Sequence, residues 1–474
     1  MCDKITENEY DILLLQEAID KAGKINVKEF KKTQDIDKII RIVENYIRSK
    51  KLICYGGTAI NNLLPVEDQF YNNTTTLFPD YDVFSKDALK DAKRITDIFV
   101  KNGYCNVEAK SGIHVGTYKI YVNFIPVLDL TQLSENIFNI LIEESIKVNG
   151  ILYASPNYLK MSMYLELSRP RGDISRWEKV YKRLKLLEKS YPFHNLKCKQ
   201  IINKAASKRE NKINKKDKMT EMFKIIKNVI IDNDLVFFGG YAISLFDEYL
   251  SPKIRQALPE IPEFDVLSNY PKTTATIIKE RLEYNGFNKI IIKKHKQVGE
   301  IVPLHYEIIV NGLSAALIYK PLGCHSFNTI KINNRHVNVA TINTMMSFYL
   351  AFLFINRPRY DKERILCLAE QLFKIQQNHK TSKNSVVKTF GDECYGEQTT
   401  LEEIRAEKNK KFKQLRHDRK SKEYQKYFLR YSPCMDKDKK NYYKKKFSCK
   451  NKNKTKRDKS KKSKKTRKNK FLLF

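Results

Sequence analysis

The sequence contains two copies of one unit. Residues 55–85, YGGTAINNLLPVEDQFYNNTTTLFPDYDVFS, align without a gap on residues 238–268, FGGYAISLFDEYLSPKIRQALPEIPEFDVLS, at an offset of 183. Farther along, YKIYVNFIPVLDL from Tyr118 aligns on YEIIVNGLSAALI from Tyr306 at an offset of 188, so one five-residue insertion joins the two blocks. Because self-similarity of this length is the mark of a repeated structural unit, we expect two similar units in tandem.

The repeat also sets the expected organisation of the 474-residue chain. The helical pattern before each Gly pair is repeated, as IIRIVENYI from Ile39 and MFKIIKNVI from Met222, and RPRGD from Arg169 matches RPRYD from Arg357. We therefore expect an N-terminal helical segment at 1–37, a catalytic unit at 38–190, a basic connector at 191–218, a degenerate unit at 219–378, a polar and basic C-terminal segment at 379–435, and a Lys-rich tail at 436–474.

Basic residues are concentrated in the last part of the chain. The formal net charge is +35, and residues 401–474 alone hold 30 Lys and Arg against 8 Asp and Glu. The final segment is Lys/Asn/Ser low complexity, which cannot build a core, so we expect it to be disordered. A basic chain with 27 Tyr and 25 Phe fits a nucleic-acid partner, because phosphates bind cations and bases stack on aromatic rings.

The cysteines and the apolar runs indicate in which cellular compartment the protein is expected. The nine Cys are irregularly spaced with no C-x-x-C pair, so we expect neither a disulfide framework nor a zinc site, and we expect a reducing compartment. The longest apolar run, residues 345–355, is about half of what a bilayer span requires, and the N-terminus has no basic leader. The sequence thus predicts a soluble intracellular protein.

Each unit is expected to be a mixed α/β fold. In the first unit, residues 39–47 carry apolar side chains at helical spacing, and the apolar KLICY that follows ends at a Gly pair, which indicates a buried strand. TAINNLL favours a short helix that ends before Pro65, and DYDVFS alternates as a strand does. The predicted fold class is α/β (mixed α+β), with a small mixed sheet and flanking helices in each unit.

A Gly pair and three acidic residues form the centre of the predicted site. Gly56 and Gly57 lie between a strand and a helix, where backbone amides can approach a phosphate closely. Asp80 and Asp82 point to the same side of one predicted strand, and Asp129 lies at the end of a later strand. A pocket of carboxylates suits Mg²⁺, and two such ions can activate an attacking hydroxyl and stabilise a leaving pyrophosphate.

Two more residues complete the predicted site. The hydroxyl of Thr58, directly after the Gly pair, can donate to a phosphate, and Lys160 can bind a triphosphate oxygen. A lone histidine before a strand is more often a surface or packing residue, so His114 is left out of the site. For RPRGD we favour a helix-to-helix turn in which Pro170 ends one helix and Asp173 caps the next.

These motifs resemble those of a known enzyme superfamily. The Gly pair, then DYD, then an acid on a later strand are similar to the signature of DNA polymerase β-like nucleotidyltransferases. More closely, CYGGTAINNLLP followed by FPDYDVFS resembles the poly(A) polymerase catalytic subunits of large DNA viruses, of the poxvirus, asfarvirus and giant-virus kind. The resemblance covers a whole unit, and it explains why 22 residues separate Gly57 from Asp80, about twice the separation in many superfamily members.

The resemblance implies an activity, cofactors and partners. It implies transfer of AMP from ATP to the RNA 3′ end, with two Mg²⁺ or Mn²⁺ ions and release of pyrophosphate. It implies either a homodimer or a separate processivity subunit, no membrane, and a location in the host cytoplasm at the viral factory and in the virion. The implied metal ligands are Asp80, Asp82 and Asp129, and the implied ATP-binding residues are Gly56, Gly57, Thr58 and Lys160.

The second copy is expected to be catalytically inactive. Glu263 and Asp265 correspond to Asp80 and Asp82, but Leu317 corresponds to Asp129. Because leucine cannot coordinate a metal ion, we assign the second unit to packing or to RNA contact.

Rival functions remain open at this stage. The expected function is template-independent polyadenylation of mRNA, but another RNA nucleotidyltransferase, such as a terminal uridylyltransferase or an oligoadenylate synthetase, would use the same acids. A non-catalytic RNA-binding scaffold is the alternative from another class. In each case we expect the Lys-rich tail to bind RNA without sequence preference.

Overall fold

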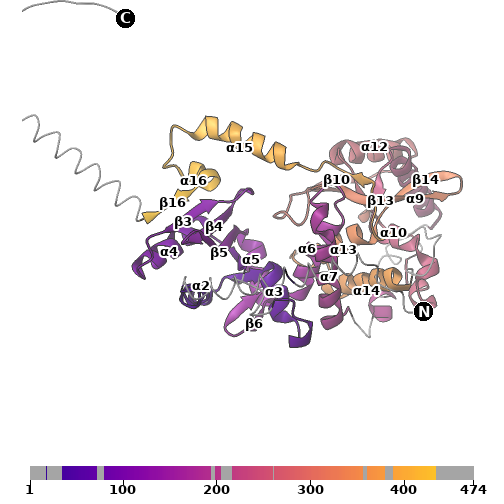
Figure 1. The fold of residues 1–474 in the computed structure, drawn as a ribbon. Helices are drawn as coiled ribbons and strands as arrows, with labels where there is room; N and C mark the ends of the chain where they lie inside the picture. Colours follow the sequence, from indigo (N-terminus) through magenta and orange to yellow (C-terminus); the bar gives the residue numbers. More distant parts are fainter. Residues whose placement is uncertain are drawn as a thin grey trace, which may run out of the picture.

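The structure, a computed structural model, describes residues 18, 35–71, 80–193, 198–203, 216–259, 261–355, 360–378 and 388–433. Within these ranges the chain forms two mixed eight-stranded sheets with helices around them (Figure 1). This confirms the predicted fold class. The predicted N-terminal segment, apart from its last residues, and the Lys-rich tail lie outside the described residues.

The first sheet has the order β16-β3-β4-β5-β2-β1-β7-β6. The central pairs β1–β7 and β2–β5 are parallel, and the other pairs are antiparallel. Its strands are β1 (Ile53–Tyr55), β2 (Asp82–Ser85), β3 (Val107–Ser111), β4 (Thr117–Val122), β5 (Ile125–Gln132), β6 (Ile146–Val148), β7 (Ile151–Tyr153) and β16 (Arg430–Tyr431).

The second sheet repeats this topology. Its order is β10-β11-β12-β9-β8-β14-β13-β15, and the pairs β8–β14 and β9–β12 are parallel, as their counterparts are. Each sheet has an irregularity at the same place, between Ile120 and Tyr121 and between Ile308 and Ile309, which is the 188-residue offset of the sequence repeat. The strands are β8 (Val236–Phe237), β9 (Phe264–Leu267), β10 (Ile290–His295), β11 (His305–Val310), β12 (Leu313–Tyr319), β13 (His325–Ile332), β14 (Arg335–Ala340) and β15 (Cys394–Tyr395).

The helices also follow the repeat. In α2 the side chains of Ile39, Val43 and Ile47 recur at helical spacing and are fully buried, as the sequence predicts. α4 and α12 occupy positions 183 residues apart. The helices of the first unit are α2 (Ile36–Lys50), α3 (Gly56–Leu63), α4 (Ala88–Lys101), α5 (Glu135–Glu144), α6 (Pro156–Leu167) and α7 (Trp177–Ser190). Those that follow are α9 (Lys216–Asp232), α10 (Gly240–Ser244), α11 (Pro252–Arg255), α12 (Pro271–Tyr284), α13 (Ile342–Phe352), α14 (Lys362–Asn378), α15 (Leu401–Leu415) and α16 (Lys422–Phe428).

RPRGD is a helix-to-helix turn, as predicted, but its details differ. α6 ends at Leu167, and a short 3-10 helix (Ile174–Arg176) precedes α7. The predicted cap is wrong: the Asp173 carboxylate bonds no backbone amide of that helix and accepts a hydrogen bond from the Ser175 hydroxyl at 2.5 Å.

The two units pack through equivalent helices, α6 and α13. Every side chain of α13 is buried, because this helix lies between the second sheet and the first unit. Across the boundary, the Ser326 amide donates to the Ser168 carbonyl at 2.8 Å, and the rings of Tyr158 and Phe354 meet edge to face at 5.1 Å. The units therefore share one continuous core.

The expectation that the cysteines form no disulfides is wrong. Disulfides join Cys198 to Cys367 and Cys324 to Cys394. The partners are 169 and 70 residues apart, so only the tertiary fold brings them together. No helix among the described residues has the length and apolarity needed to cross a bilayer.

The C-terminal segment adds a strand to both sheets. β15 pairs with β13 at an edge of the second sheet, and β16 pairs with β3 at an edge of the first. α15 and α16 run between these two strands, across the space between the units (Figure 1). The sequence predicts a basic helix here, but not the strands that fix it at both ends.

Candidate active site

A cavity of about 520 Å³ lies in the first unit, beside the turn between β1 and α3. Both residues of the Gly pair and all three predicted acids line it. The structure therefore brings together five of the seven predicted site residues: Gly56, Gly57, Asp80, Asp82 and Asp129.

The strand register places the acids. Asp82 on β2 is the direct partner of Asp129 on the neighbouring parallel strand β5, so the two side chains share one face of the sheet. Asp80 lies two residues before Asp82 and outside β2, so the strand begins later than the sequence predicts. Burial raises the pKa of Asp82 to about 7, and the carboxylates of Asp80 and Asp129 act in the same direction. The protein thus leaves negative charge on this wall of the cavity only partly balanced.

Lys119 forms an ion pair with one of these acids. It lies opposite Asp129 on the antiparallel strand β4, and its ammonium donates to that carboxylate. Burial raises the pKa of Asp129, whereas this ion pair acts against the rise. Sequence reasoning missed Lys119, although its position two residues into YKIYVNF gives it the same strand face as Asp129.

Each glycine of the pair is required by a close approach. Gly56 has a φ of +73°, and a Cβ atom there would lie 2.5 Å from Oδ2 of Asp82. At Gly57 a Cβ atom would lie 2.6 Å from the Tyr71 hydroxyl and 2.9 Å from Nη1 of Arg183. The turn therefore has an acidic group against one glycine and a cationic group against the other.

Three cations that the sequence analysis did not select also line the cavity, and we call them its cationic wall. Arg176 precedes α7, and Lys179 and Arg183 lie one turn apart on it. The Arg183 guanidinium donates to the Tyr71 hydroxyl at 2.8 Å. Arg183 is the main cause of a lowered pKa of Lys179, followed by burial and by Arg176. Crowded cations of this kind attract an anion.

The two remaining predicted residues lie outside the cavity lining. Thr58 is buried, and its hydroxyl donates to the Asp80 carbonyl at 2.6 Å, so it fixes the backbone just before β2. Lys160 is also buried, with its ammonium bonded to the Tyr191 carbonyl and 3.9 Å from the centre of the Phe193 ring. Burial lowers the pKa of Lys160 to about 8.

His114, which the sequence analysis left out, lines the cavity. It belongs to the loop 112–116 between β3 and β4, three residues of which line the cavity. Nothing in the local sequence distinguishes this loop, because its position depends on the sheet edge that carries it.

The second unit keeps part of this arrangement. Asp265 on β9 pairs with Leu317 on β12, in the same register in which Asp82 pairs with Asp129. The structure therefore confirms the residue correspondence on which the expected loss of the third acid depends.

The donor chemistry of the first unit suits a hard divalent cation. Asp80, Asp82 and Asp129 offer only carboxylate oxygens, and the raised pKa of Asp82 reflects charge that a cation would balance. In the part of the chain that is described, no three Asp, Glu, His or Cys side chains are already gathered as a metal cage, and Asp129 is engaged by Lys119.

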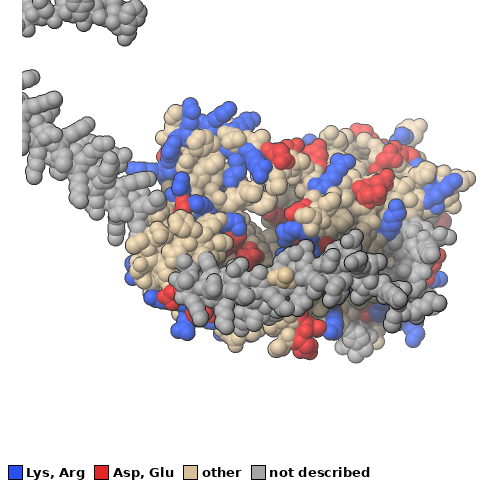
Figure 2. Space-filling view, viewed as in Figure 1, with Lys and Arg blue, Asp and Glu red and all other residues tan. Residues whose placement is uncertain are grey.

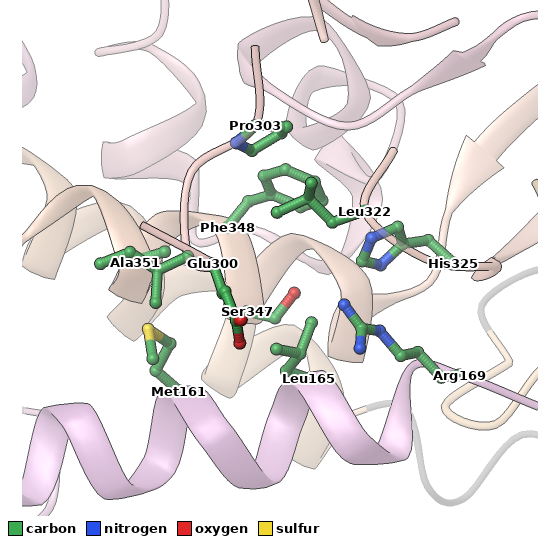
Figure 3. Close-up of a pocket in the computed structure, with 11 residues that line it drawn as sticks. Met161, Leu165, Arg169, Glu300, Pro303, Leu322, His325, Ser347, Phe348 and Ala351 are labelled. Carbon is green, nitrogen blue, oxygen red and sulfur yellow. The ribbon is translucent and has the colours of Figure 1, made fainter. Parts of the chain in front are cut away.

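A second, small cavity of about 20 Å³ lies where α6 meets α13, with room for little more than a water molecule (Figure 3). Arg169 and His325 point into it from opposite units, with Glu300 nearby. Within the described structure, Nε of Arg169 and Nε2 of His325 are buried without a hydrogen-bond partner. Burial, followed by the charge of Arg169, lowers the pKa of His325 to about 3.

Comparisons with known proteins bear on this site. Residues 41–173 match the family described as "Poly(A) polymerase catalytic subunit", and this span includes all three acids and the Gly pair. A protein of African swine fever virus (strain Badajoz 1971 Vero-adapted), described as a poly(A) polymerase catalytic subunit, is 32% identical over 174 residues. This match covers 35% of the chain and 36% of that relative.

Two giant-virus proteins match over longer spans. A protein of Acanthamoeba polyphaga mimivirus with the same description is 24% identical over 399 residues, covering 76% of the chain and 67% of the relative. The crystal structure of the Megavirus polyadenylate synthase has a TM-score of 0.72 at 19% identity, over 91% of this chain and 87% of that one. The resemblance stated from the sequence is confirmed, and the structural match shows a shared fold.

Proposed function

We propose that this chain is the catalytic subunit of a template-independent poly(A) polymerase, a polynucleotide adenylyltransferase that transfers AMP from ATP to the 3′ end of mRNA. The observation that carries the proposal is a single cavity lined by Asp80, Asp82 and Asp129 and by the cationic wall, with Gly56 against Asp82 and Gly57 against Arg183. Glu166 also lines this cavity and pairs with Arg176 at 3.3 Å. A scaffold that only bound RNA would not need buried carboxylates, which repel a polyanion.

The cationic wall suits the triphosphate of ATP. Arg183, Lys179 and Arg176 surround a space beside the turn that begins α3, where backbone amides also favour an anion. Arg183 is held by Tyr71 and by the Phe70 ring 4.5 Å from its guanidinium carbon, so its charge is positioned before ATP binds. We assign these three cations, with Gly56 and Gly57, to the triphosphate.

The three acids suit the RNA 3′ end and the α-phosphate of ATP, where the reaction takes place. In the proposed reaction the RNA 3′-oxygen forms a bond to the α-phosphorus of ATP, the bond from that phosphorus to pyrophosphate breaks, and the hydroxyl proton leaves. Asp80, Asp82 and Asp129 would hold two Mg²⁺ or Mn²⁺ ions, which when bound lower the pKa of the attacking hydroxyl and balance the charge of the leaving pyrophosphate. Thr58 and Lys119 position Asp80 and Asp129 through the contacts described above.

The proposed partners are RNA, ATP and either a second copy of the chain or a separate processivity subunit. The family description "catalytic subunit" supports a partner subunit. The proposed location, in the host cytoplasm and in the virion, rests on the viral relatives alone.

Extension of a labelled short RNA tests the proposal. The purified full chain is incubated with Mg²⁺ or Mn²⁺ and each nucleoside triphosphate separately, beside an Asp82→Asn variant. We expect long products with ATP and none with the variant. Extension with UTP would keep the chemistry and move the function to a uridylyltransferase, and products formed from ATP without an RNA primer would indicate an oligoadenylate synthetase. Tight RNA binding without extension under any of these conditions would favour the scaffold.

A further inference from the structure

We propose that the C-terminal strap, residues 394–433, holds the phosphate backbone of single-stranded RNA at the opening of the active-site cavity. The strap consists of β15, α15, α16 and β16 with their connections. The inference rests on the proposed function, because it says where the RNA acceptor strand lies on the protein. Its test measures RNA binding separately from nucleotide transfer.

The strap is fixed at both ends. At the second unit, β15 pairs with β13, and the disulfide between Cys394 and Cys324 adds a covalent link. At the first unit, β16 pairs with β3, Arg430 bonds the Glu108 carboxylate at 2.7 Å, and the Tyr431 hydroxyl bonds Asp97 at 2.7 Å. A helix held in this way keeps its place between the units without burying its own surface.

The strap meets the active-site loop directly. The Lys408 ammonium donates to the carbonyl of Gly112 at 2.7 Å, and Gly112 and His114 belong to the loop that lines the cavity. The Ser111 amide, next to this loop, donates to the Leu429 carbonyl at 3.0 Å. α15 therefore lies beside the loop that lines the cavity, close to where a strand whose 3′ end is in the cavity would leave.

The exposed surface of the strap is strongly basic. The whole strap contains eleven Lys or Arg and six Asp or Glu, and its basic part is residues 408–433, with ten Lys or Arg and two Asp or Glu. Figure 2 shows blue side chains gathered over α15 and α16. No side chain of α15 is buried, so this helix contributes little to a core. Cations that core packing does not require, beside an opening proposed to admit RNA, fit the regular negative charge of a nucleic-acid backbone.

Aromatic rings accompany these cations. Phe412, Tyr424 and Phe428 form a small cluster that joins α15 to α16, with the rings of Phe412 and Phe428 5.5 Å apart. Phe412 is 36% exposed, and Tyr427 lies 5.9 Å from the Lys411 ammonium. Rings between cations offer stacking surfaces to unpaired bases, which favours a single strand over a duplex.

The test compares two variants whose net charge is reduced equally. The strap variant carries Lys410→Gln, Lys413→Gln and Arg416→Gln, all exposed positions. The control variant carries Lys38→Gln, Arg41→Gln and Lys50→Gln, exposed positions on α2, which lies away from the strap (Figure 1). The dissociation constant of a labelled single-stranded RNA of mixed sequence is measured for the full chain over a range of salt concentrations, without ATP.

We expect the strap variant to bind RNA about tenfold more weakly. Its salt slope should fall by about two units, because each phosphate that the strap no longer neutralises lowers the slope by about 0.7. The control variant should keep the slope of the unaltered chain. Equal weakening in both variants would mean that only net charge matters, and an unchanged slope in the strap variant would remove the strap from the RNA path. Loss of a dimer with unchanged RNA binding would assign the strap to protein contact instead.

Photocrosslinking gives an independent readout that does not depend on altered proteins. RNA carrying 4-thiouridine a few nucleotides before its 3′ end should crosslink to peptides from 401–433, and crosslinks confined to other segments would contradict the proposal. If the unaltered chain does not extend RNA but the strap variant still shows the lower slope, the proposed function fails and the strap assignment stands. If the unaltered chain extends RNA but the salt slope of the strap variant is unchanged, the proposed function stands and the strap assignment fails.

Discussion

The two glycines at the active-site turn lie against different side chains. At Gly56 the backbone has a positive φ and lies against the Asp82 carboxylate, whereas Gly57 lies against Tyr71 and Arg183. A side chain at either position would push one wall of the cavity outward. The pair therefore lets an acidic group and a cationic group lie close against the same turn.

Arg183 gives the first residue-scale prediction. Arg183→Gln should raise KM for ATP at least about tenfold, because a hydrogen bond to a charged group is worth about 1.5–3 kcal/mol. Lys182→Gln, the adjacent residue with an exposed side chain paired to Glu178, is the matched control and should change KM less than twofold. Steady-state extension kinetics at saturating RNA measure both. Equal KM values in the two variants would contradict the assignment of the triphosphate to this wall.

Lys160, unlike Arg183, is not expected to bind ATP. Its ammonium is turned to the Tyr191 carbonyl and the Phe193 ring rather than to the cavity. Lys160→Met should therefore alter thermal stability while KM for ATP stays within about twofold. A KM increase as large as that of Arg183→Gln, with unchanged melting temperature, would restore Lys160 to the site.

At the scale of secondary-structure elements, the sequence predicts features that depend on neighbouring residues and misses features that depend on tertiary packing. The Gly pair, the acid on β2 and the acid on β5 follow from residue patterns and from the duplication, and the structure places them together. The direction of Lys179 and Arg183 depends on how α7 packs against α6, which no local pattern specifies. β15 and β16 are two residues each and form only because distant strand edges accept them.

The duplicated elements allow a matched pair of substitutions. Asp82 and Asp265 occupy equivalent positions on β2 and β9, but only Asp82 pairs with a second acid. Asp82→Asn should reduce extension by at least about a hundredfold, since it removes a proposed metal ligand. Asp265→Asn should leave extension within about twofold in a protein whose melting temperature is unchanged. Loss of activity in that folded variant would show that the second unit takes part in catalysis.

The two disulfides can be tested by alkylation of the cysteines. Cys324 and Cys394 join β15 to the second sheet, and Cys198 and Cys367 join residues 198–203 to α14. In the denatured but unreduced protein, alkylation should label Cys54 and Cys105, which are free, and should leave Cys198, Cys324, Cys367 and Cys394 unlabelled until a reductant is added. Labelling of these four cysteines before reduction, read by peptide mass spectrometry, would restore the expectation of free thiols.

At the scale of the whole molecule, the two units are held at a fixed relation by α6 and α13, and this contact encloses polar groups. Arg169, His325 and Glu300 line the small cavity there, together with Ser347, and the Ser168 hydroxyl lies 3.5 Å from Nδ1 of His325. Because α7 and its cations follow directly from α6, the same contact that joins the units also sets the position of the cationic wall of the active site.

The buried histidine makes the stability of this contact depend on pH. The pKa of His325 falls from an ordinary value of about 6.5 to about 3 in the folded protein, because burial and the Arg169 guanidinium disfavour its charged form. Between these values the unfolded chain binds more protons, so the stability present above pH 6.5 is lost as pH falls, at up to about 1.4 kcal/mol per pH unit.

Replacing the histidine isolates this contribution. His325→Gln cannot gain a proton, so the difference in unfolding free energy between the unaltered chain and the variant should be constant above about pH 7 and should shrink steadily from pH 6 to pH 4.5. Urea denaturation across this range measures it. Parallel curves for the unaltered chain and His325→Gln would mean that the imidazole becomes protonated in place, with water reaching it. In that case the small cavity would be a hydrated opening between the units rather than a closed part of their shared core.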